Sequence, residues 1–139
     1  MTRIDFHSNV ADKLAYTCRL IRKAHAANCK AIVFHTDPAI LRRLDEVLWT
    51  FTEADFLPHV MMNHPLAPVT PIVLTDDTSI PCPHYELLIN LTAITPENFS
   101  AFQRMIEIIS DDEGDKQIGR ERYRQYQQQG YNLSHSVAK

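Results

Sequence analysis

The sequence predicts an α/β protein, with three layers (α/β/α) built around a mostly parallel sheet of about five strands. Its apolar runs, such as residues 31–34, are continuous and do not alternate, which is typical of strands buried on both faces of a sheet. Amphipathic stretches with helical periodicity separate these runs. The architecture is expected to be Rossmann-like but without a glycine-rich phosphate loop, because residues 1–113 contain no glycine.

The first half of the chain is expected to form two strands and two helices. Residues 3–6 alternate polar and apolar side chains and predict a short first strand. Ser8 or Asn9 is expected to cap the first helix, which runs to about Asn28. A buried strand at residues 31–34 follows, and Asp37 caps a second helix that begins with proline and reaches Trp49. The apolar stripes of these helices are Val10, Leu14, Thr17, Cys18 and Ile21, and then Ile40, Leu41, Leu44, Val47 and Leu48.

The second half is expected to add three strands and one long helix. Residues 51–69 contain three prolines and predict an irregular segment, and a polar loop is expected at residues 76–84. Residues 95–98 are expected to start a short helical turn, and Gly130 is expected to end the last helix. The strands are placed at residues 71–75, 87–91 and 105–109, and the last helix at residues 111–129.

Composition and length predict one domain that spans residues 1–139. The chain has a mass of 16.0 kDa, with 45% hydrophobic and 22% charged residues, close to the average of globular domains. No apolar run is long enough for a transmembrane helix, and the first residues do not resemble a signal peptide. Three widely spaced cysteines favour reduced thiols. We therefore expect a cytoplasmic location and no membrane partner.

Charge is distributed unevenly along the chain. Residues 116–139 hold five lysines and arginines against one acid, a net charge of +4, whereas residues 1–115 carry −7. A basic element of this kind usually meets an acidic partner, although a solvated helix face without a partner would have the same composition. The overall charge of −3 argues against strong direct binding to nucleic acid.

The sequence shows no assembled catalytic or cofactor site. Missing glycine motifs exclude a dinucleotide enzyme and a P-loop ATPase, and GxSxG is absent as well. Seven histidines invite a metal, but none of them belongs to a matched pair of ligands with zinc spacing. We expect no metal, no cofactor and no catalytic residue. The alternative is a small metal-dependent α/β hydrolase or nuclease that uses His35, Asp37 or the pair Asp76 and Asp77.

Two clusters of residues do suggest binding. One face of the last helix carries cations around an aromatic ring, an arrangement that can hold an apolar side chain and a carboxylate together. This face consists of Lys116, Arg120, Tyr123, Arg124 and Gln127. The aromatic patch, at the end of the second helix, consists of Trp49, Phe51, Phe56 and Pro58, and it either seals the core or forms a docking surface. A further alternative is direct single-stranded DNA binding through the last helix and Tyr123, Tyr126 and Tyr131.

The same segments resemble the chi subunit of bacterial DNA polymerase III holoenzyme. The similar segments, in order, are residues 44–51 (LDEVLWTF), 56–59 (FLPH), 88–91 (LINL), 119–126 (GRERYRQY) and 130–131 (GY). The match in their order and spacing extends over nearly the whole chain. One departure is the opening strand, where this chain has Arg3-Ile4-Asp5-Phe6-His7 in place of a more hydrophobic run.

The resemblance implies an accessory protein of the clamp loader without enzymatic activity. Members of the family bind the acidic C-terminal tail of single-stranded DNA-binding protein, which ends in Pro-Phe, and this role transfers to Arg120, Tyr123 and Arg124. Arg124 stands where some relatives have lysine, which keeps the charge but changes the geometry. Chi also pairs with the psi subunit, a role that transfers to Phe56 and Trp49. An accessory helicase is a further expected partner at the aromatic patch.

Overall fold

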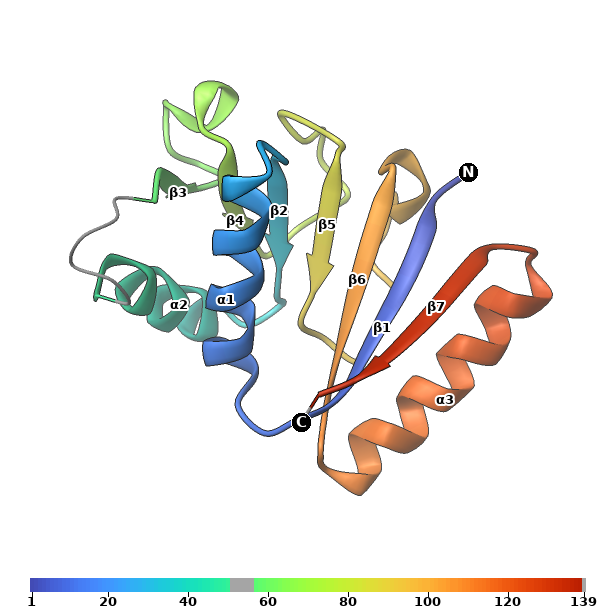
Figure 1. The fold of residues 1–139 in the computed structure, drawn as a ribbon. Helices are drawn as coiled ribbons and strands as arrows, with labels where there is room; N and C mark the ends of the chain where they lie inside the picture. The colour runs from blue at the N-terminus through green and yellow to red at the C-terminus, as the bar shows by residue number, and fades with distance from the viewer. Residues whose placement is uncertain (51–56, 139) are drawn as a thin grey trace.

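The computed structural model describes residues 1–50 and 57–138, which form a seven-stranded sheet and three α-helices (Figure 1). The strand order is β3-β4-β2-β5-β6-β1-β7, and every neighbouring pair is parallel. The strands are β1 (Arg3–Val10), β2 (Ala31–Phe34), β3 (His59–Met61), β4 (Ile72–Thr75), β5 (Leu87–Asn90), β6 (Arg104–Ser110) and β7 (Asn132–Val137). The helices are α1 (Lys13–Ala26), α2 (Pro38–Thr50) and α3 (Glu113–Gln128).

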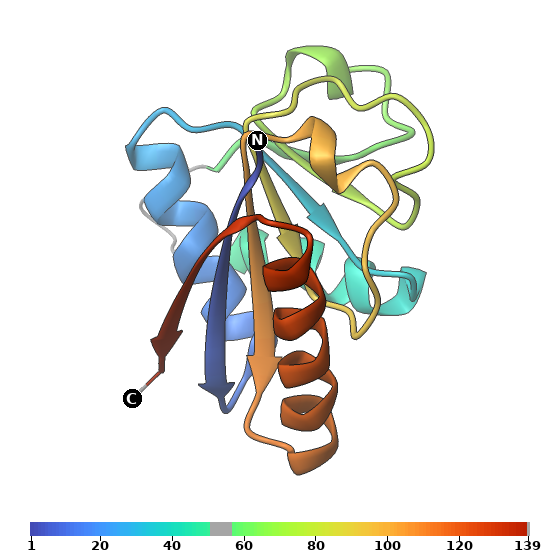
Figure 2. The same ribbon diagram turned by 90° about the vertical axis from the view of Figure 1, so that its right-hand side faces the viewer.

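Helices cover both faces of the sheet, as the continuous apolar strands predict. Figure 2 shows α1 and α3 on opposite sides of the strands. Alternate residues of one strand enter different cores: Ala31 and Val33 pack under α1 and α2, whereas Ile32 and Phe34 pack on the side of α3. The predicted fold class is confirmed, with two more strands than expected.

The two unexpected strands, β3 and β7, are the two edges of the sheet. β3 has only three residues and falls in the segment predicted to be irregular. β7 reads Asn-Leu-Ser-His-Ser-Val and is mostly exposed. An edge strand pairs on one side only and need not be apolar on both faces, so the signal that located the central strands is absent.

The start of α1 and the turn after β5 differ from the prediction. β1 continues to Val10, so Ser8 and Asn9 do not cap a helix, and Asn9 takes a left-handed conformation with φ 60°. Asp12 caps α1 instead, accepting a hydrogen bond from the amide of Ala15 at 3.2 Å. Parallel pairing of β1 with β7 as far as Ser8 keeps the end of β1 extended.

The helical turn predicted to start at residues 95–98 is a 3₁₀ helix at Phe99–Ala101.

Other local predictions are confirmed. Asp37 accepts a hydrogen bond from the amide of Ala39 at 2.9 Å and so caps α2. Asn28 and Gly130, beyond the ends of α1 and α3, have the positive φ values of 57° and 86°. No helix in the described ranges is long and apolar enough to cross a membrane.

Candidate functional site

A groove of about 640 Å³ runs between α3 and the carboxyl ends of β1 and β7. Figure 2 shows these three elements side by side at one edge of the sheet. Four of the predicted binding residues line the groove on α3, namely Lys116, Arg120, Tyr123 and Arg124. The other lining residues come from four elements: Phe6, Ser8 and Asn9 from β1, Ile109 from β6, Gly119 from α3, and His135 and Val137 from β7.

The start of α3 is fixed tightly to the sheet. Asp112 caps the helix by accepting a hydrogen bond from the amide of Asp115 at 3.1 Å. The carboxylate of Asp115 accepts a hydrogen bond from the amide of Ser110 at 2.8 Å and forms an ion pair with the ammonium group of Lys13 at 3.1 Å. Burial raises the pKa of Asp115, but these hydrogen bonds and the charge of Lys13 outweigh burial and lower the pKa below its ordinary value. These contacts anchor the helix end that carries the groove residues.

Close packing brings α3 down onto β6. Gly119 is buried in the middle of the helix, and a Cβ atom at this position would lie only 2.9 Å from Cδ1 of Ile109. Without that atom the helix approaches the strand closely, and both residues line the groove.

An aromatic pair forms the floor of the groove. The ring of Tyr123 meets the buried ring of Phe6 edge to face, with centroids 5.2 Å apart. Tyr123 is half-buried, so part of its side chain remains accessible from the groove. The floor can therefore receive an apolar or aromatic side chain.

The wall formed by α3 is cationic. Arg120 and Arg124 are exposed, one turn apart on the helix. Lys116 is partly buried, and its ammonium group lies 3.7 Å from the exposed carboxylate of Glu113. An ion pair with so exposed a partner is weak, so Lys116 can exchange Glu113 for a ligand. Gln127 is exposed on the same helix but does not line the groove.

The opposite wall of the groove was missed by sequence reasoning. His135 and Val137 stand on β7, and the ring of His135 shares a hydrogen bond with the hydroxyl of Ser8 over 2.6 Å. β1 and β7 are parallel neighbours although about 130 residues separate them, as the pairing of Phe6 with His135 shows. No local pattern in the sequence signals this pairing.

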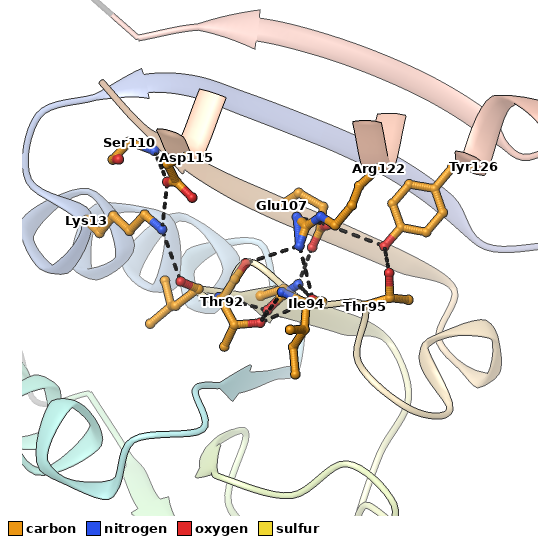
Figure 3. Close-up of polar contacts among 11 residues, drawn as sticks. Lys13, Thr92, Ile94, Thr95, Glu107, Ser110, Asp115, Arg122 and Tyr126 are labelled. Atoms are coloured by element: carbon orange, nitrogen blue, oxygen red, sulfur yellow. Dashed lines mark hydrogen bonds and ion pairs between the residues drawn. The ribbon is translucent and has the colours of Figure 1, made fainter. Parts of the chain in front are cut away.

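One of the arginines counted in the basic C-terminal segment does not reach the surface. Arg122 is buried and pairs with the buried carboxylate of Glu107 on β6 (Figure 3). Its Nη1 atom also donates to the carbonyl oxygens of Thr92 and Ile94 at 3.2 and 3.0 Å. Burial raises the pKa of Glu107, and the charge of Arg122 opposes this rise. The pair fastens α3 to β6 and to the loop after β5, and it adds no charge to the groove.

The aromatic patch lies far along the sheet, at the end of α2. Trp49 is 53% exposed, so this residue does not seal the core. Its ring packs against that of His59, with centroids 4.8 Å apart, and His59 lies 3.2 Å from a carboxylate oxygen of Asp45. Pro58 is half-buried next to this pair, whereas Phe51 and Phe56 lie outside the described residues.

The residues of the enzymatic alternative make local backbone contacts. The ring of His35 accepts a hydrogen bond from the amide of Asp37 at 2.9 Å, and the carboxylate of Asp77 accepts hydrogen bonds from the amide and the hydroxyl of Ser79. Asp76 lines a second cavity of about 370 Å³ with Arg42 at the carboxyl edge of β4. Within residues 1–50 and 57–138, no three histidine, cysteine or acidic side chains gather as a metal site would require. Burial raises the pKa of the Cys18 thiol to about 11, which keeps it protonated.

The fold and the groove describe an α/β domain whose larger hollow is basic, with an aromatic floor, and suited to binding a ligand. The sequence pattern of the DNA polymerase III chi subunit family, HolC, matches residues 1–134, and the chain belongs to this family. It is 31% identical over 137 residues to DNA polymerase III subunit chi of Pseudomonas aeruginosa, covering 96% of this chain and 94% of the relative.

More distant relatives carry the same name. DNA polymerase III subunit chi of Haemophilus influenzae is 29% identical over 117 residues, covering 84% of this chain and 81% of the relative. The subunit of Escherichia coli is 23% identical over 117 residues, with coverage of 84% and 80%. The chain is thus a chi subunit of DNA polymerase III, an accessory subunit of DNA replication, as the sequence resemblance predicted.

Proposed function

We propose that this chain is a non-catalytic adaptor of the clamp loader, which binds the acidic C-terminal tail of single-stranded DNA-binding protein in the α3 groove. The observation that carries the proposal is the pairing of a cationic wall, Arg120 and Arg124, with an aromatic floor, Phe6 and Tyr123. An acidic peptide that ends in an aromatic residue needs both features at once.

Each part of the tail has a partner in this proposal. The terminal phenylalanine ring packs on Tyr123 and Phe6, and the terminal carboxylate pairs with Arg120. Lys116 and Arg124 attract the acidic residues that precede it, and Gln127 lies one further turn along the helix, where upstream residues of the tail would pass. Because a disordered tail loses entropy when it binds, we expect a dissociation constant of micromolar order.

Isothermal titration with an acidic peptide ending in Asp-Ile-Pro-Phe tests the proposal. We expect saturable binding that weakens as salt rises, because the contacts are between exposed charges. Arg120→Ala should weaken binding by about tenfold or more, since a hydrogen bond between charged groups contributes about 1.5–3 kcal/mol.

The matched control is Arg43→Ala, which removes an exposed arginine of α2 that does not line the groove. It should change the affinity by less than about twofold. Equal affinities of the wild type and Arg120→Ala would contradict the assignment of the groove.

We further propose that the aromatic patch pairs with the psi subunit of the clamp loader. The exposure of Trp49 supports this proposal, because large exposed aromatic side chains are frequent anchors of protein interfaces. Phe56 is expected to be the second anchor, as the family resemblance implies, and Phe51 and Pro58 are expected to contribute to the same interface. An accessory helicase that uses the same patch would compete with psi.

Size-exclusion chromatography of co-expressed proteins tests the second interface. Trp49→Ala and Phe56→Ala should lose co-elution with psi and still bind the tail peptide. Ile94→Ala is the control, since Ile94 is also 53% exposed but lies on the loop after β5. Co-elution of psi with both aromatic variants would overturn the assignment of the patch.

A further inference from the structure

The opening strand, where this chain departs from the family resemblance, has a polar face that helix α1 covers in part, where Tyr16 contacts His7. Residues 3, 5 and 7 of β1 point to the side of α1, opposite the groove, because Ile4 and Phe6 belong to the core on the side of α3. In Figure 1, α1 and α2 stand in front of the other half of the sheet, and β1 and β7 are open to the viewer.

A buried carboxylate holds two arginines on this face. The side chain of Asp5 is 3% exposed, and its carboxylate accepts hydrogen bonds from Nε of Arg3 at 3.1 Å and from Nε of Arg104 at 2.5 Å. Ser134 on β7 donates its hydroxyl to the same carboxylate. The side chains of Arg3 and Arg104 remain 62% and 44% exposed. Within residues 1–50 and 57–138, the terminal nitrogens of these two guanidinium groups make no hydrogen bond, so oriented donors face solvent.

Helix α1 extends the positive charge beside these arginines. Tyr16 shares a hydrogen bond with His7 over 2.5 Å, and the guanidinium of Arg19 lies 5.6 Å from the centre of the Tyr16 ring. Burial lowers the pKa of His7, and the charges of Arg104 and Lys23 lower it further against the opposing effect of Asp5.

Helix α1 itself and the segment that follows it contain no acid. Residues 13–36 hold five lysines and arginines and no aspartate or glutamate. The cationic face, which we define as Arg3, Arg19, Lys23 and Arg104, therefore carries four positive charges, and the carboxylate of Asp5 holds the two arginines of the sheet.

We propose that the cationic face binds the phosphate backbone of single-stranded nucleic acid. Guanidinium groups held by a carboxylate present a planar set of donors that matches the oxygens of a phosphate. The four cations of this face line neither the groove nor the second cavity, so the face is separate from both. Binding of this kind depends on salt and not on base sequence. The affinity is modest, because the whole chain carries a charge of −3.

Fluorescence anisotropy with a labelled oligothymidylate tests the proposal, with salt varied from about 0.05 to about 0.2 M. Contacts with three or four phosphates predict a slope of log affinity against log salt of about −2 to −3. The double variant Arg3→Gln/Arg104→Gln should lose about two of these contacts and reduce the slope by about 1.4. Because this variant leaves Asp5 without its cations, Arg19→Gln/Lys23→Gln provides a second test that does not touch the carboxylate.

The matched control is Arg120→Gln/Arg124→Gln, which removes the same charge from the groove on the opposite face. It should bind the oligonucleotide like the wild type and lose the tail peptide, so the two proposals fail separately. Oligonucleotide binding that is unchanged in both variants of the cationic face would overturn the inference. Equal losses of oligonucleotide affinity in all three variants would also overturn it, because they would indicate diffuse attraction. Binding of polyglutamate to this face without binding of the oligonucleotide would overturn it as well.

Discussion

Helices α1 and α3 are both basic and lie on opposite faces of one sheet, but they form different surfaces. Helix α3 contacts β6, β1 and β7, and its cations overhang a groove with an aromatic floor. Helix α1 packs on β6 and α2 and reaches β1 through the contact of Tyr16 with His7, and in Figure 1 most of β1 and β7 lies beyond this helix. The cations of α1 therefore border an open polar face. The lateral position of a helix across the sheet decides whether its charges surround a hollow or a flat surface.

Strand β1 contributes to both surfaces through alternate residues. Phe6 forms the floor of the groove, and Asp5 organises the cationic face one residue earlier. The two faces also differ in their buried charges: the pair of Arg122 and Glu107 lies entirely inside, whereas Asp5 is buried beneath arginines that remain exposed. Substitutions on each surface test this difference.

The largest effect is expected at the buried pair on the α3 side. Arg122→Met leaves the carboxyl of Glu107 buried without its cation and should cost about 3–5 kcal/mol of unfolding free energy. Chemical denaturation followed by circular dichroism measures this loss. The double variant Arg122→Met/Glu107→Leu should recover much of the loss, because an apolar pair removes the uncompensated charge. A loss as small as that of the exposed Arg120→Ala would show that the pair does not anchor α3.

A smaller effect, which depends on pH, is expected at Asp5. Burial raises the pKa of this carboxyl, but hydrogen bonds from Ser134 and Arg104 and the charges of Arg104 and Arg3 outweigh burial and lower the pKa. A carboxyl with a lowered pKa stabilises the fold above its unfolded pKa of about 3.9, and that stabilisation is lost as the pH falls further. Asp5→Asn should therefore cost about 1.5–3 kcal/mol at neutral pH.

Urea denaturation of wild type and Asp5→Asn between pH 7 and pH 3 checks this prediction. The difference between the two proteins should narrow as the pH falls from about 5 to about 3. Asp76→Asn, at an exposed carboxylate, is the control and should differ little from the wild type at any pH. A gap that stays constant or widens in acid would contradict the role given to Asp5.

The smallest effect is expected on the β7 wall of the groove. His135→Ala removes a ring that shares a hydrogen bond with Ser8 and borders the groove, but it leaves the arginines of α3 in place. Affinity for the tail peptide should fall only about two- to fivefold, because the variant removes one side chain at the border of the groove and leaves its charged contacts in place. Isothermal titration of the tail peptide into the wild type, His135→Ala and Arg120→Ala compares the three affinities. A loss equal to that of Arg120→Ala would mean that β7 contributes as much as α3.

Much of the fold followed from local patterns. The central strands β2, β4 and β5 each have a continuous apolar run, and that of β6 is interrupted by Glu107 alone; the caps Asp37 and Gly130 follow from residue type. One wall of the groove was also predictable, because Lys116, Arg120, Tyr123 and Arg124 share a face of an amphipathic helix. Sequence spacing alone determines which residues share a helix face.

The remainder depended on tertiary structure. Arg120 and Arg122 are two positions apart and identical in type, but Glu107 on β6 draws only Arg122 into the interior. β7 has no apolar signature, and its pairing with β1 creates the second wall of the groove from residues about 130 positions apart. Local patterns reflect conformational preferences of neighbouring residues, whereas the partners of a buried charge or an edge strand are set by which distant groups the folded chain brings into contact.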